Sequence, residues 1–228
     1  MFFPDRIHIR DGERVLEVGP GGSPHPRADV LLERRFDERE SAAQRGHTPP
    51  LKVAREVIFY DGGRFPFEDH AFDYVICSHV LEHVENVPEF VGELARVAPR
   101  GYLEFPTVFY EYLYHFRVHR NLLRFAAGEL RWMRKERLPF QEFLPVQTFF
   151  YNSLCAGYDE LVVSLQPQMF EGFEWSGSMV TRETQDLSEL CPADKSFVFP
   201  ANPLKPPPTP GRELLRELLR RAKRRLLR

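Results

Sequence analysis

Residues 65–106 read FPFEDHAFDYVICSHVLEHVENVPEFVGELARVAPRGYLEFP. Within this stretch, residues 72–78 are apolar almost throughout, as expected of a strand that is covered on both faces. Asn86 can then cap a helix and Pro88 suits its first turn, and the apolar residues that follow have helical spacing. A further apolar run at 102–105 makes another strand. Two strands joined by a crossover helix predict a parallel pair.

Three apolar runs precede this stretch, at residues 14–18, 28–33 and 56–61. A glycine-rich turn, Gly-Pro-Gly-Gly at 19–22, ends the first of them, and such a turn lets backbone N–H groups approach a ligand closely. Strands interleaved with crossovers predict an α/β fold with a mostly parallel sheet and helices on both faces. Only SPHPRAD at 23–29 joins the first two strands, and its two prolines forbid all but a turn of helix there.

Two segments resemble the class I S-adenosylmethionine (SAM) dependent methyltransferases. Residues 17–23, EVGPGGS, resemble their E/D-x-G-x-G-x-G motif, with Ser23 at the third glycine. Residues 65–106 resemble the type-11 methyltransferase signature LPFxDxSFDxVxxxxVLEHV…ELxRVLKPGGxL in register. The resemblance covers roughly the first half of the chain. It implies a Rossmann-like class I methyltransferase sheet, here with a shortened first helix, and SAM as the cofactor.

The same resemblance assigns residues at the strand ends to the cofactor. Glu33, at the end of the second strand, can accept hydrogen bonds from both ribose hydroxyls. Asp61 and Gly62 end the third strand, where this family places a carboxylate that reads the adenine amino group. The predicted cofactor-binding residues are Glu17, Gly19, Gly21, Glu33, Asp61, Gly62 and Ser78.

His79, Glu82 and His83 follow the fourth strand, at the edge of the sheet where α/β proteins bind ligands. If the chain is helical from Ser78 onward, the two histidines share a face. Two roles remain open. His79 can act as the general base that removes a proton from the acceptor, with His115 as a second catalytic candidate. Alternatively, His79, Glu82 and His83 hold a divalent cation such as Mg²⁺, as matching residues do in the ubiquinone O-methyltransferases that this segment resembles.

The character of the sequence changes at residue 107, where an aromatic and basic insertion of about 107–145 begins. Gly128-Glu129 is a candidate hairpin turn, residues 147–163 have helical character, and 169–175 and 178–182 read as short strands. The aromatic side chains of the insertion predict either an acceptor pocket suited to a sugar or a phenol, or the ordinary core of the insertion. These side chains include Tyr110, Tyr112, Tyr114, His119 and Trp132.

The charge of the chain is unevenly distributed. Residues 211–228 carry eight basic and two acidic side chains, whereas the chain as a whole has a formal net charge of −2. We divide the chain into a methyltransferase domain at 1–199, a proline-rich linker at 200–210 and a basic amphipathic helix at 211–228. The helix suits reversible contact with an anionic membrane, a contact with a second subunit, or a solvated tail.

Three cysteines without pairing or metal spacing suggest a reducing cytoplasm, and the N-terminus has no signal-peptide pattern. Three functions compete. The first is O-methylation of a small molecule or saccharide, including a cell-surface glycan precursor. The second is a SAM-fold protein that binds partners without catalysis. The third, RNA methylation, ranks lowest because the body of the protein is acidic, so we expect no nucleic-acid partner.

Overall fold

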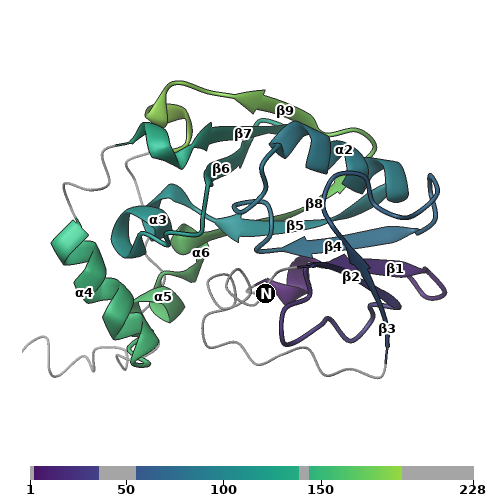
Figure 1. The fold of residues 1–228 in the computed structure, drawn as a ribbon, viewed down its shortest axis with the longest axis horizontal. Coiled ribbons are helices and arrows are strands. Elements are labelled where there is room, and N and C mark those ends of the chain that lie inside the picture. The colour runs from purple at the N-terminus through teal and green to yellow at the C-terminus, as the bar shows by residue number, and fades with distance from the viewer. Residues whose placement is uncertain (1–2, 36–54, 139–143, 192–228) are drawn as a thin grey trace, which may run out of the picture.

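A computed structural model describes residues 3–35, 55–138 and 144–191 of the 228-residue chain. Its centre is a six-stranded sheet in the order β3-β2-β1-β4-β5-β8 (Figure 1). The strands are β1 (Val15–Val18), β2 (Val30–Arg34), β3 (Glu56–Tyr60), β4 (Tyr74–Ser78), β5 (Arg100–Pro106) and β8 (Phe170–Ser176). The first five are parallel and β8 runs antiparallel to β5. The predicted mostly parallel α/β sheet is confirmed.

Helix α2 (Val87–Val97) connects β4 to β5 and covers one face of the sheet. Asn86 caps it, because its side-chain oxygen accepts a hydrogen bond from the Glu89 amide at 3.2 Å, and Pro88 lies in the first turn. The buried side of α2 packs into the main core, which buries residues of β1, β2 and β4 as well. The predicted start and face of this helix are confirmed.

On the other face of the sheet, the described residues contribute extended chain and a 3-10 turn, whereas residues 36–54, which connect β2 to β3, lie outside the described part of the chain. No helix lies between β1 and β2, as the prolines at 24 and 26 predict. Among the described residues, the N-terminal segment covers this face instead. Phe3, Ile7 and Ile9 pack against a buried cluster that includes Tyr74 and Tyr102. This part of the face is therefore covered by extended chain with a 3-10 turn, η1 (Pro4–Arg6).

A second sheet of three strands lies on the same side as α2 (Figure 1). Strands β6 (Asn121–Ala126) and β7 (Glu129–Arg134) form the predicted hairpin, and β9 (Val180–Glu183) pairs in parallel with β7. Ala127 and Gly128 make the turn with φ values of 54° and 77°, the left-handed conformation that tight hairpins require. Trp132 joins the main core, so this sheet belongs to the same packed body.

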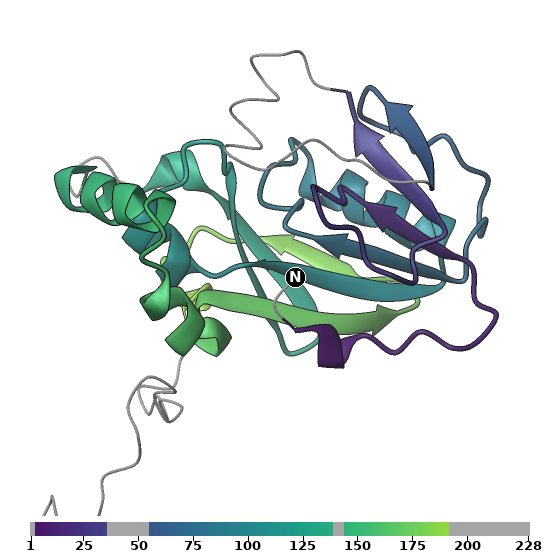
Figure 2. The same ribbon diagram turned by 90° about the horizontal axis from the view of Figure 1, so that it is seen from below.

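The remaining helices gather on the side of the molecule away from β2 and β3 (Figure 2). They are α3 (Val108–Tyr114), α4 (Leu144–Cys155), α5 (Glu160–Ser164) and α6 (Gln166–Met169), with 3-10 turns η2 (Lys135–Arg137) and η4 (Leu187–Glu189). The predicted helical segment 147–163 is thus divided into α4 and α5. The linker at 200–210 and the tail at 211–228 lie outside the described residues. Within the described part of the chain, no helix has the length and apolar character needed to cross a membrane.

Candidate functional site

A cavity of about 410 Å³ lies at the carboxyl ends of β1, β2 and β3 and beside the turn that follows β4. This is the edge of a parallel sheet at which ligands bind in α/β proteins. Its size is within the range of about 300–1,000 Å³ for small-molecule sites. The lining residues are Val18, Gly19, Gly21, Leu32, Glu33, Arg34, Tyr60, Asp61, Gly62, Gly63, His79, Val80, His83, Val84, Glu85, Asn86, Glu89 and Phe90.

The glycine turn after β1 forms one wall of the cavity. Gly19 and Gly21 have φ values of +65° and +58°, a conformation that L side chains rarely adopt. A Cβ on Gly19 would lie 2.4 Å from the Val80 side chain. Glycine is therefore required at position 19, both for its conformation and for the close approach of the turn after β4.

Two carboxylates occupy the strand ends around this wall. Glu33 at the end of β2 is 6% exposed, and Asp61 after β3 pairs with Arg35 at 3.6 Å between Nη1 and Oδ1. Both line the cavity, together with Gly62. The structure therefore brings together five of the seven residues that the sequence assigned to the cofactor.

The other two, Glu17 and Ser78, lie behind the cavity wall and do not line it. A Glu17 oxygen accepts a hydrogen bond from the His25 amide at 2.7 Å and so fixes the loop that follows the glycine turn. Burial raises the pKa of Glu17 to about 7, although that hydrogen bond and the nearby Arg55 oppose the shift. Ser78 donates a hydrogen bond to Glu104 at 2.8 Å. Both contacts brace the site from within the sheet.

His79 directly follows β4 and has a left-handed backbone with φ of 57°. The expected helix from Ser78 is wrong, because the chain forms a tight turn at 81–83. The ring of His79 lies between two carboxylates: Nδ1 is 3.4 Å from Glu82 and Nε2 is 3.0 Å from Glu104. Burial disfavours the charged imidazole, but these two carboxylates outweigh it and raise the pKa of His79 to about 9.

Glu104 is a site residue that sequence reasoning missed. It is buried in β5 and accepts hydrogen bonds from the Tyr102 hydroxyl at 2.6 Å and from the Phe3 amide at 3.1 Å, in addition to its contacts with Ser78 and His79. A single charged residue in the apolar run GYLEFP was the available signal. A carboxylate in a strand buried on both faces needs such partners.

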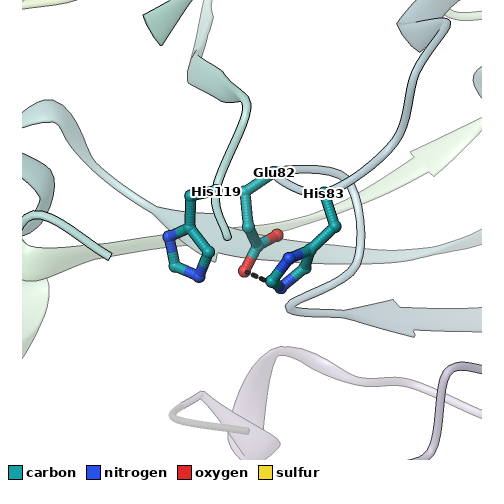
Figure 3. A group of neighbouring side chains, drawn as sticks. All are labelled: Glu82, His83 and His119. Atoms are coloured by element: carbon teal, nitrogen blue, oxygen red, sulfur yellow. Dashed lines mark ion pairs between the residues drawn. The ribbon is translucent and has the colours of Figure 1, made fainter. Parts of the chain in front are cut away.

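Glu82 and His83 project from the turn at 81–83, and His119 comes from the segment before β6 (Figure 3). The rings of His83 and His119 meet edge to face with centroids 4.6 Å apart. Burial alone would raise the pKa of Glu82, but the nearby imidazoles of His79, His83 and His119 lower it to about 2. The sequence pattern groups His119 with the aromatic insertion, because nothing in the residue spacing links it to His83.

The insertion contributes less to the cavity than expected. Tyr110 and Tyr114 pack with Phe170 in a cluster beneath α3, and Trp132 belongs to the main core. These three rings of the insertion therefore pack as core side chains and do not line this cavity. His115 ends α3 with φ of 46° and does not line the cavity. Burial lowers the pKa of His115, assisted by the neighbouring Lys135.

The family model Methyltransf_11, a methyltransferase domain, matches residues 30–105. A curated relative, the bifunctional methionine biosynthesis protein MetXA/MetW of Rhodopirellula baltica, is 38% identical over 76 residues. Those residues are 32% of this chain and 12% of the relative, so the chain spans only a small part of that protein. The region that the family model matches, residues 30–105, contains β2, β3, β4, α2 and nearly all of β5.

Solved structures with a similar arrangement include the YcgJ protein of Bacillus subtilis, at 22% identity and a TM-score of 0.34 over 47% of this chain and 52% of that one. A putative methyltransferase of Bacillus halodurans has 22% identity and a TM-score of 0.35, over 49% and 56%. A SAM-dependent methyltransferase of Mesorhizobium loti has 15% identity and a TM-score of 0.38, over 72% and 90%. The chain spans about half the length of the first two.

Proposed function

We propose that this chain is a class I, SAM-dependent methyltransferase that transfers the methyl group of SAM to a hydroxyl of a small molecule, and the match of residues 30–105 to a methyltransferase family model supports this. The observation that carries this proposal is one cavity lined by the glycine turn, Glu33 and His79 together. Cofactor residues and proton-handling residues thus face one space. Displacement at a sulfonium needs that proximity, because the acceptor must be aligned with the methyl carbon.

For the cofactor, Glu33 is proposed to accept hydrogen bonds from the two ribose hydroxyls, and Asp61 to accept one from the adenine amino group. Gly19 and Gly21 leave room for the sulfonium end, since neither has a side chain to block the wall. No helix follows these glycines, and the loop held by Glu17 fixes the chain that leaves the glycine turn.

For the acceptor, the proposal places a hydroxyl near His79. The S–C bond of SAM breaks as the O–C bond forms, S-adenosylhomocysteine leaves, and the hydroxyl proton must be accepted. As His79 lies, both its nitrogens face carboxylates, so the proton acceptor is the unit of His79, Glu82 and Glu104 and not the imidazole alone. Because the two carboxylates raise the pKa of His79 to about 9, the unit accepts the hydroxyl proton in those molecules whose imidazole is neutral, and this fraction grows as pH rises toward 9.

A small hydroxylated molecule fits better than a long glycan, because the aromatic rings expected to stack on a sugar pack into the core. His115 is a weaker candidate for the general base than His79, because His115 does not line the cavity. We retain as a proposal the reversible contact of residues 211–228 with an anionic membrane or a second subunit. Sedimentation with anionic and neutral liposomes tests it: full-length protein should pellet only with anionic vesicles, and protein lacking 211–228 should not.

Calorimetric titration of the full chain with SAM, followed by transfer of labelled methyl from SAM to a panel of small hydroxylated and aminated acceptors, tests the function. We expect SAM binding and label in hydroxylated acceptors, recovered as an ether. Binding without transfer to any acceptor would favour the competing function, a SAM-fold protein that recognises partners without catalysis. Label only in amines would overturn the O-methylation part while keeping the methyltransferase part.

A further inference from the structure

The group of Glu82, His83 and His119 has the composition and spacing of a metal site (Figure 3). One ligand atom from each residue lies within 4.8 Å of those of the other two. Donors around a tetrahedral Zn²⁺ lie about 3.3 Å apart, given metal–ligand bonds of about 2.0–2.1 Å. Small rotations of these side chains toward one another would therefore close the site.

Glu82 supplies the carboxylate that this group needs. Its side chain is 1% exposed, and among the described residues its oxygens have ion-pair contacts at 3.4 Å to His79 and 4.0 Å to His83 but no hydrogen bond. A buried carboxylate without hydrogen bonds is costly, and a bound cation would compensate it.

Both histidines are oriented as metal ligands usually are. Nδ1 of His83 lies 3.3 Å from the Val118 carbonyl oxygen, and Nδ1 of His119 contacts the buried carboxylate of Glu111. Each contact leaves Nε2 directed away from it and available to a cation. Metal-binding histidines generally donate their second N–H to a carboxylate or a carbonyl in this manner, which fixes the tautomer. Glu111 is itself held by Lys135, whose Nζ donates at 2.5 Å.

The two segments that carry these ligands are fastened together. The side-chain amide of Asn121 donates to the Leu81 carbonyl at 3.0 Å and to the Val84 carbonyl at 2.8 Å. The backbone amides of Arg120 and Asn121 donate to the Glu82 carbonyl at 2.7 and 3.0 Å. The turn at 81–83 and the segment at 119–121 therefore keep a fixed separation, which is what a preformed metal site requires.

We propose that Glu82, His83 and His119 bind one divalent transition-metal ion, Zn²⁺ or a close equivalent, beside the part of the cavity that His83 lines. Two imidazoles and one carboxylate are a frequent ligand set of catalytic zinc, whereas Mg²⁺ prefers oxygen ligands. Because His83 also lines the cavity, the remaining coordination position can receive an oxygen of the acceptor. This extends the proposed function, although metal binding itself can be measured without methyl transfer.

The ligand set differs from the one that the sequence predicts. His79 is replaced by His119, since both nitrogens of His79 already face carboxylates. A cation at this site would also draw Glu82 away from His79. His79 would then keep Glu104 at Nε2, and its Nδ1 would turn from a carboxylate contact to the acceptor.

The test is calorimetric titration of EDTA-treated, full-length protein with Zn²⁺, with Mg²⁺ as the comparison. We expect one equivalent of Zn²⁺ to bind and Mg²⁺ to bind far more weakly. His119→Gln and His83→Gln should each weaken Zn²⁺ binding by roughly 100-fold or more, since each removes a ligand. His79→Gln and the exposed control His8→Gln should bind Zn²⁺ like the unsubstituted protein. Circular dichroism of each variant shows whether it is folded.

The visible absorption spectrum of the Co²⁺-loaded protein gives a second measurement that needs no variant, because tetrahedral nitrogen and oxygen coordination produces strong bands. Absence of stoichiometric Zn²⁺ binding, or the same affinity in His119→Gln as in the unsubstituted protein, would overturn the proposal. Loss of binding in His79→Gln and His83→Gln but not in His119→Gln would overturn the proposal and point to the ligand set expected from sequence. Zn²⁺ binding in a protein that does not bind SAM would uphold the metal site and reject the proposed function.

Discussion

The cofactor end of the cavity, with Gly19, Glu33 and Asp61, is built differently from the acceptor end, by which we mean His83 and the adjoining His119. At the cofactor end, Gly19 and Asp61 directly follow β1 and β3 and Glu33 lies near the end of β2, so each is placed by its own strand. At the acceptor end, His83 and His119 come from segments that are distant in the sequence, and hydrogen bonds from Arg120 and Asn121 to the turn at 81–83 and to Val84 hold these segments together. The cofactor end therefore depends on the sheet, and the acceptor end depends on how an insertion packs against it.

This difference implies that the two ends can be disabled separately. A substitution at the acceptor end should reduce methyl transfer and leave SAM affinity intact, and a substitution at the cofactor end should reduce affinity first. The following variants test that separation in order of expected effect.

His79→Gln should have the largest effect. The amide cannot take up a proton, so we expect methyl transfer to fall by about 100-fold or more. SAM affinity, measured by calorimetry, should stay within about twofold. The control is His70→Asn, since His70 is exposed and Asn tolerates its left-handed backbone. Full activity in His79→Gln would remove His79 from the proton-accepting unit.

Glu33→Ala should act on the cofactor instead. Hydrogen bonds to a charged group contribute about 1.5–3 kcal/mol each, so the loss of even one of the two should weaken SAM binding by at least about tenfold. Glu56→Ala is a matched control, because Glu56 is exposed at the opposite end of the neighbouring strand β3. If SAM affinity in Glu33→Ala matches that control, the end of β2 does not hold the ribose.

The cofactor end depends on local sequence patterns and the acceptor end on the packing of distant segments, and this difference decides what could be predicted from the sequence. The sheet, α2 and the hairpin follow from local patterns of apolar spacing, capping and turn residues, and these were predicted correctly. The glycine turn and the strand-end carboxylates share that local origin. The sequence does not predict that Glu104 contacts His79 or that His119 contacts His83, because these contacts depend on how β5 and the insertion pack. The expected helix after β4 failed for the same reason, since Asn121 holds a turn there.

Asn121→Ala tests the fastening of the two segments. It leaves the Leu81 and Val84 carbonyls without their side-chain partner, so we expect the free energy of unfolding to fall by about 1–3 kcal/mol. Methyl transfer should fall further than SAM affinity. Urea denaturation followed by fluorescence gives the first quantity, and labelled-SAM assays give the second. Equal losses of transfer and affinity would show that the two ends are not separable.

Glu17→Gln should give the smallest effect, one that depends on pH. Because the folded-state pKa of Glu17 is raised to about 7, the folded protein binds the proton more tightly than the unfolded chain. Stability should therefore fall as pH rises from about 4.5 to about 7, and this contribution should disappear in Glu17→Gln, whose amide oxygen can still accept from His25. Unfolding midpoints between pH 5 and 8 measure the slope. An unchanged slope would mean that Glu17 ionises normally.

The hydrogen bond from the Phe3 amide to Glu104 makes the N-terminal residues part of the smallest fragment that would contain the whole site. Through Glu104, the first residues of the chain are connected to His79, although they lie outside the region that matches the methyltransferase family. A fragment trimmed to residues 30–105 would lack the glycine turn, the Phe3 contact and His119. Domain boundaries drawn from family similarity would thus divide this site, and any chain shortened for expression or crystallisation should begin before Phe3 and extend beyond Trp175.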